Sequence, residues 1–311
     1  MSDNKITVGE RQNISSISAA AAILELGEPV RRAMVETKAT CPFIGPAAAT
    51  GLLPIRQDAN NPLAAIEDVR MLGNSGGGDL GDLLTIFASG NHAFMRGDSG
   101  KLDRPVPEGL FSLELPGSQG SHPGHSGILQ GDPSVLASDR FSRDDFERLI
   151  SRARVGLIKR SDVAHFIAEN LHRDPKAKVF GPGVARLLAR DLNAFVSDIG
   201  PALLKQIGHV DQQGPAAHRE LEEKLTRLLA EDNLIGSAGE FGLLFAFFAN
   251  QPGALQVDGQ PTLPIADINA MFVEKRFPNG WDGWKKRRVD WVANTTALLI
   301  GAGTAYLSIN P

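Results

Sequence analysis

The most informative stretch of the chain surrounds its only cysteine and reads Cys41-Pro42-Phe43-Ile44-Gly45-Pro46-Ala47-Ala48-Ala49-Thr50-Gly51-Leu52-Leu53-Pro54. A helix-forming segment precedes it, Pro42 prevents that helix from continuing directly, and the small residues after it favour a second helical piece. This geometry aims successive backbone N–H groups at the sulfur, which favours the thiolate over the thiol. Cys41 is therefore a candidate nucleophile or metal ligand. The alternative for a lone cysteine is packing in the core as a small hydrophobe.

Apolar residues recur at spacings of three and four along most of the chain, and no comparable run alternates with a period of two. The pattern predicts a mainly helical protein. We expect a polar N-terminal tail over 1–15 and a single helical domain over 16–311. The predicted helices are 18–25, 29–38, 61–72, 79–88, 143–157, 161–171, 183–196, 215–231, 237–250, 264–275 and 286–300.

Two segments depart from helical periodicity. Gly, Pro, Ser and Asp accumulate over about 97–138, which is far longer than an ordinary connection, so we expect a long irregular loop there. The glycine-rich run over 73–78 has no predicted strand before it and no lysine at the P-loop spacing. We interpret that run as a flexible joint rather than a phosphate-binding loop.

Composition argues against several classes of protein. The net charge is −4 over 311 residues, and the lysines and arginines are scattered. This charge gives no reason to expect a nucleic-acid-binding protein. The polar start of the chain lacks the pattern of a secretion signal, so we expect a cytoplasmic protein. The apolar segment 291–309 is interrupted by Asn294, Gly301 and Gly303, which favours a terminal core helix over a membrane span. The oligomeric state is left open.

Four stretches resemble signatures of the haem-thiolate peroxidases, the family of fungal chloroperoxidase and the unspecific aromatic peroxygenases. Cys41-Pro42 followed by Gly51-Leu52-Leu53-Pro54 resembles the haem-ligand segment, and 125–134 is similar to the loop that lies at the haem propionates. Ser237-Ala238-Gly239-Glu240 is similar to the segment bearing the distal acid, and 271–281 resembles a later family signature. The stretches occur in the family's order. The resemblance implies a single-domain chloroperoxidase-like fold that binds haem b.

The resemblance also implies roles for individual residues. Cys41 would be the axial ligand of the haem iron, and Glu240 would be the acid–base residue that handles the proton of hydrogen peroxide. The apolar residues after Glu240 should raise the pKa of its carboxyl by desolvation. Phe241 and Phe245 are expected to line the distal pocket. On the residues alone, Glu240 is also explained as a helix-start carboxylate, and the phenylalanines as ordinary core.

The chain departs from the family at two places. Gln130, with Gly131 and Ser134, stands in the propionate loop where the family has a glutamate that binds a divalent cation. An amide in place of a carboxylate weakens a site for Mg²⁺ or a similar ion. The family pairs its distal acid either with an arginine seven residues earlier or with a histidine in the propionate loop. Here Asn233 and Gly131 occupy those positions.

The resemblance implies a haem-dependent peroxidase or peroxygenase that uses hydrogen peroxide to oxidise a small organic substrate. The expected partners are that substrate and the peroxide, without nucleic acid or membrane. Two alternatives stay open. One is a non-catalytic helical binding protein that kept the fold, and the other is a haem enzyme with reassigned chemistry.

Overall fold

The computed structural model describes residues 23–24, 26–38, 41–58, 61–85, 94–100, 102–113, 143–173 and 233–309. Helices account for about 57% of it and the strands are short, so the prediction of a mainly helical protein is confirmed. One cluster of buried apolar side chains extends from Val35 to Ala302 and joins the N-terminal and C-terminal parts of the described chain.

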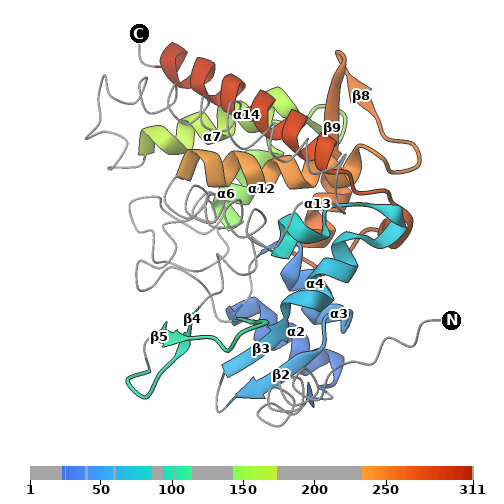
Figure 1. Ribbon diagram of the computed structural model, residues 1–311. Coiled ribbons are helices and arrows are strands. Elements are labelled where there is room, and N and C mark those ends of the chain that lie inside the picture. The colour runs from blue at the N-terminus through green and yellow to red at the C-terminus, as the bar shows by residue number, and fades with distance from the viewer. Residues whose placement is uncertain are drawn as a thin grey trace, which may run out of the picture.

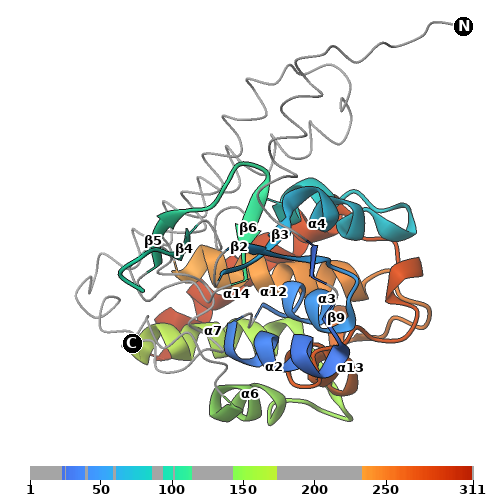
Figure 2. The same cartoon turned by 90° about the horizontal axis from the view of Figure 1, so that it is seen from below.

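Three helices from the C-terminal half pack side by side: α7 (Arg160–Arg173), α12 (Asn233–Phe248) and α14 (Arg288–Ile309) (Figures 1 and 2). From Ala238 to Phe248, every residue of α12 except Glu240 is buried, as expected for a helix that is apolar all round. Among the described helices, α14 alone is long and apolar enough to cross a membrane. Its buried side chains include Trp291, Thr295, Leu298 and Ala302, at helical spacing.

The N-terminal half lies on the other side of α12 in Figure 1 and contains α2 (Glu28–Lys38), α3 (Ile44–Thr50) and α4 (Ile66–Gly73). Gly51 ends α3 with a φ of 80°, a conformation that glycine adopts without strain. The Arg31 Nε donates a hydrogen bond of 3.2 Å to the Ala49 carbonyl, which ties α2 to the end of α3. Helix α13 (Ile265–Phe272) contacts α3.

Three small antiparallel sheets accompany the helices. The largest has the order β1-β2-β3-β6, and the others have the orders β4-β5 and β7-β9-β8. Asn61 fixes one sheet to the next, because its amide exchanges hydrogen bonds of 3.0 and 2.7 Å with the backbone of Arg96. The strands are β1 (Ile23–Leu24), β2 (Ile55–Asp58), β3 (Asn61–Ala65), β4 (Phe94–Arg96), β5 (Leu102–Pro105), β6 (Leu110–Ser112), β7 (Leu157–Lys159), β8 (Gln256–Val257) and β9 (Gln260–Pro264).

These strands correct several predictions. The predicted helix 61–72 is a strand up to Ala65 and a helix only from Ile66, and β1 lies within the predicted helix 18–25. The predicted helix 143–157 ends earlier, as α6 (Arg143–Ile150). Strands β5 and β6 lie within the predicted irregular loop. The rest of that loop from 114, and the predicted helices 183–196 and 215–231, lie outside the described residues.

The segment 73–78, interpreted as a flexible joint, makes specific contacts with the C-terminal half of the chain, although Asn74, Gly76 and Gly77 are exposed. Its 3-10 turn η1 (Ser75–Gly77) lies against a second one, η4 (Trp281–Gly283). Lys286 is fully buried between them, and its ammonium donates hydrogen bonds of 2.8 Å to the Ser75 hydroxyl, 2.8 Å to the Trp281 carbonyl and 2.9 Å to the Trp284 carbonyl. The lysine therefore joins two turns that are far apart in sequence.

Two adjacent glycines allow a test of this packing. Gly76 and Gly77 both have positive φ, but a Cβ on Gly76 would lie 2.4 Å from the Trp284 carbonyl oxygen, whereas a Cβ on Gly77 meets nothing within 4 Å. We expect Gly76→Ala to lower the free energy of unfolding by about 3 kcal/mol and Gly77→Ala by about 1 kcal/mol, the cost of positive φ alone. Urea denaturation measures both, and equal losses would contradict the close contact at Gly76.

Candidate active site

Cys41 stands immediately before α3, and the local backbone surrounds its sulfur with donors, as predicted. The backbone N–H groups of Phe43 and Ile44 donate to the sulfur and lower its pKa. The Cys41 carbonyl accepts a hydrogen bond of 2.9 Å from the N–H of Gly45, which starts the helix. From Cys41 to Ala49, Cys41 alone is half-buried and the other residues are buried.

The donors favour the thiolate, as predicted, but they are not strong enough to make the uncoordinated side chain a thiolate. Burial, the largest cause, raises the pKa of Cys41 to about 11, and the nearby Glu240 carboxylate raises it further. The Phe43 and Ile44 donors and the charge of Lys275 lower it by less. Cys41 is thus a neutral thiol near pH 7. A coordinated metal ion reverses this balance, because metal binding removes the thiol proton.

Glu240 comes to the same region from α12. Burial raises the pKa of its carboxyl to about 7, which confirms the direction expected from the apolar sequence around it. It is the one residue from Ala238 to Phe248 that is half-buried rather than buried. Cys41 and Glu240 therefore share two properties: each is desolvated strongly enough to shift its pKa, and each is half-buried in an otherwise buried stretch.

A cluster of aromatic rings around Phe43 lies next to Cys41 in the core. The Phe43 ring lies 5.5 Å from that of Phe247 in α12, 5.5 Å from that of Phe277 and 6.0 Å from that of Trp281, between centroids. The Phe277 and Trp281 rings stack at 3.8 Å. The stretches 41–54 and 271–281, which are distant in sequence, thus meet each other and α12, the helix that carries Glu240.

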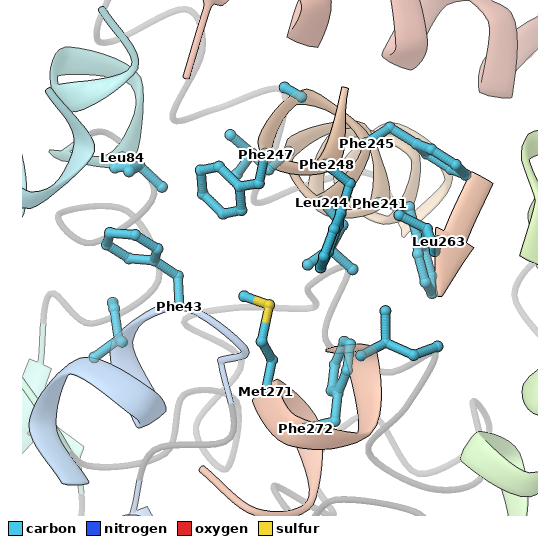
Figure 3. Close-up of a cluster of buried hydrophobic side chains, with 14 of the residues drawn as sticks. Phe43, Leu84, Phe241, Leu244, Phe245, Phe247, Phe248, Leu263, Met271 and Phe272 are labelled. Carbon is cyan, nitrogen blue, oxygen red and sulfur yellow. The ribbon is translucent and has the colours of Figure 1, made fainter. Parts of the chain in front are cut away.

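Phe241 and Phe245 are core residues in this structure, only 2% and 0% exposed. Phe245 lies on the side of α12 away from Phe43 (Figure 3). Phe247 faces Phe43 instead, and it was missed by the sequence analysis although a signal existed. It follows Glu240 by seven positions, about two helical turns, and so shares a face with it. Met271 of α13 also points toward α12 in Figure 3.

Lys275 is a second residue that the sequence analysis missed. It directly follows the Glu274 position of the 271–281 stretch, is buried and has a φ of 50°. Its charge acts on Cys41 and lowers the pKa of the thiol. The positive φ of a lysine gives no signal in sequence, because it is set by the packing after α13.

The described residues suit a haem better than a bare metal ion. No group of three or more His, Cys, Asp or Glu side chains within the described part of the chain could hold a metal ion. A single half-buried cysteine beside an apolar and aromatic cluster would suit a haem iron, because a porphyrin would supply the nitrogen ligands that the described residues do not. Gln130, Gly131 and Ser134 lie outside the described residues, and Asn233 is the first residue of α12.

Comparisons of the chain with family models, curated proteins and solved structures found no match. The argument for function accordingly rests on the residues of the site.

The electrostatic link between Cys41 and Glu240 can be measured by alkylation of the haem-free chain. Because the thiolate is the reactive form and the pKa of Cys41 is about 11 rather than 9.0, alkylation near neutral pH should be about a hundredfold slower than at an ordinary cysteine. Glu240→Gln removes a negative charge only above the pKa of Glu240, about 7. The variant should therefore react several-fold faster than wild type above that pH and at the same rate well below it. Equal rates at every pH would show that the two groups do not interact.

Proposed function

We propose that the chain binds haem b through Cys41 and uses hydrogen peroxide to oxidise a small organic substrate, as a peroxidase or peroxygenase with a chloroperoxidase-like fold over 16–311. One observation carries the proposal. Cys41 and Glu240 are each half-buried within otherwise buried stretches, and the Glu240 carboxylate acts on the thiol electrostatically. The order of the sequence stretches that resemble the haem-thiolate peroxidases supports the same assignment.

Cys41 is the proposed haem ligand. A haem bound through a thiolate supplies the redox chemistry, since electron donation from sulfur favours cleavage of the O–O bond of a peroxide. The protein prepares the ligand in two ways. The N–H groups of Phe43 and Ile44 stabilise negative charge on the sulfur, and the positive charge of Lys275 does the same.

Glu240 is the proposed acid–base residue. A carboxyl with a pKa of about 7 is present in both protonation states near neutral pH, so it can accept a proton and return it with little cost. Its carboxylate oxygen would take the proton from one oxygen of hydrogen peroxide and deliver it to the other, which would depart as water, while a bound haem would accept the remaining oxygen atom. Glu240 thereby replaces water as the proton carrier in an apolar site.

The buried aromatic cluster supports an apolar substrate. Phe43, Phe247 and Phe277, together with Met271, bring apolar side chains from three parts of the chain next to Cys41. A substrate bound beside such a cluster would be shielded from water and would itself be apolar or aromatic. A divalent cation at Gln130, Gly131 and Ser134, a cytoplasmic location and the absence of nucleic-acid and membrane partners stay predictions.

Haem uptake tests the ligand. The purified chain should bind haemin, and its ferrous carbon monoxide complex should absorb at the wavelength typical of thiolate ligation. Cys41→Ala should lose that absorption, because Cys41 is the only cysteine in the sequence. A wild-type chain that takes up no haemin would instead favour the non-catalytic binding protein.

Peroxide turnover tests the acid. Glu240→Gln should keep the haem spectrum and lower the rate of peroxide turnover by about 10²-fold, the usual scale for a general acid–base group. Glu67→Gln is a matched control, because Glu67 lies on the surface of α4 in an ion pair with Arg70. Unchanged turnover in Glu240→Gln would remove Glu240 from the mechanism. Haem binding without any turnover of peroxide would favour reassigned chemistry.

A further inference from the structure

Helix α14 contacts α12 on both sides of Glu240. One residue before it, the Gly239 carbonyl accepts a hydrogen bond of 2.9 Å from the indole Nε1–H of Trp291. Trp291 is fully buried, so this bond is protected from water. The Gly239 carbonyl thus has a hydrogen-bond donor from outside α12. This bond holds that turn of α12 against α14.

Two residues after Glu240, the helices touch through backbone. A Cβ placed on Gly242 would lie 2.1 Å from the Thr295 Oγ1 and 3.2 Å from both the Thr295 Cβ and its backbone nitrogen. Only glycine fits this approach. Thr295 is fully buried, and its hydroxyl has no hydrogen-bond partner among the described residues. Its part in the contact is therefore steric.

The two contacts fix the direction of Glu240. Gly239 and Gly242 share the face of α12 that meets α14, and the next residue after Gly239 is turned by about 100° around the axis. Glu240 thus points away from α14, on the same face as Phe247, which meets Phe43. A rotation of α12 by about 15° would move a carboxyl lying about 6 Å from the helix axis by about 1.5 Å. Displacements of this size cost about 10²-fold in rate when a catalytic group is involved.

We propose that Trp291 and Thr295 of α14 are positioning residues for Glu240: the hydrogen bond to Gly239 and the close contact at Gly242 set the rotation of α12 and so direct the carboxyl toward Cys41. This inference rests on the proposed function for its catalytic consequence. The positioning itself is a property of the protein without haem. Neither α14 residue contributes a reacting group.

The main test is a compensation cycle at the close contact. Gly242→Ala should rotate or displace α12, because the new methyl group meets the Thr295 Oγ1. Adding Thr295→Ala removes this oxygen, so the double variant should recover the wild-type position of α12. Gly301→Ala is the matched control. It introduces a similar clash, with a Cβ 2.9 Å from the Ala164 Cβ, but on the side of α14 that packs on α7.

The readouts separate positioning from stability. In the haem-free chain, the titration of Glu240 is followed by the infrared absorption of its carboxyl, taken as the difference from Glu240→Gln. Gly242→Ala should shift this titration by half a pH unit or more, and the double variant should return it toward wild type. Gly301→Ala should lose stability without any shift. With haem bound, Gly242→Ala should lower kcat for peroxide turnover about tenfold and move its pH profile, while KM for the organic substrate stays unchanged.

Trp291→Phe is the second variant, in case Gly242→Ala fails to fold. It keeps the aromatic packing and removes only the donor to Gly239, and it should shift the Glu240 titration in the same assay. Lower stability with an unchanged titration in both Gly242→Ala and Trp291→Phe would overturn the inference and leave these contacts purely structural. A shifted titration in a protein that binds no haem would uphold the positioning and reject the proposed function.

Discussion

Desolvation of two ionisable groups is the physical constraint on which the site depends. The interior around α3, α12 and α13 is apolar, and it raises the pKa of both Cys41 and Glu240. The fold tolerates them because each is able to become neutral. Under the proposed haem binding, the positive charge of the iron would offset the negative charge of the thiolate. The apolar setting that disfavours a free thiolate would then tolerate a coordinated one.

The rest of the architecture holds these two groups at the same place. Cys41 is fixed by the start of α3, which packs against α2 and α13. Glu240 is fixed by α12, whose opposite face lies on α14. Lys286 supports the aromatic cluster around Phe43 from one side. Its ammonium lies 4.5 Å from the centroid of the Trp281 ring, and its hydrogen bonds join Trp281 to Ser75. Each support is formed by residues distant in sequence, so the site exists only in the folded chain.

The sequence predicted what depends on local pattern. The long helices α7, α12 and α14 have apolar residues at helical spacing and were all predicted, although α12 begins four residues before its predicted start and α14 ends nine residues after its predicted end. The short strands were missed because they are stabilised by partners elsewhere, as Asn61 shows with Arg96. The contacts of the run 73–78 were missed for the same reason, since they come from Trp284 and Lys286.

In the candidate site, too, local features were predictable and contacts between distant residues were not. The donors to the Cys41 sulfur come from the next residues and were predicted, whereas the net shift of its pKa depends on burial and on Glu240 and could not be. Phe247 was within reach, because its spacing from Glu240 is helical. The core position of Phe245 could be recognised only once the neighbours of α12 were known.

Glu240 is costly to the fold, and this supports the role proposed for it. Among the residues that the structure describes, no hydrogen bond or ion pair reaches its carboxyl, and desolvation is the one cause of its raised pKa. A group with a folded-state pKa of about 7, above the ordinary 4.5, stabilises the fold at low pH, and that contribution is lost as pH rises through 7. Near neutral pH an ionised Glu240 therefore destabilises the fold, whereas a glutamine at this position would carry no charge. A carboxyl that weakens the fold near the only cysteine of the sequence is what the proposed acid–base role requires.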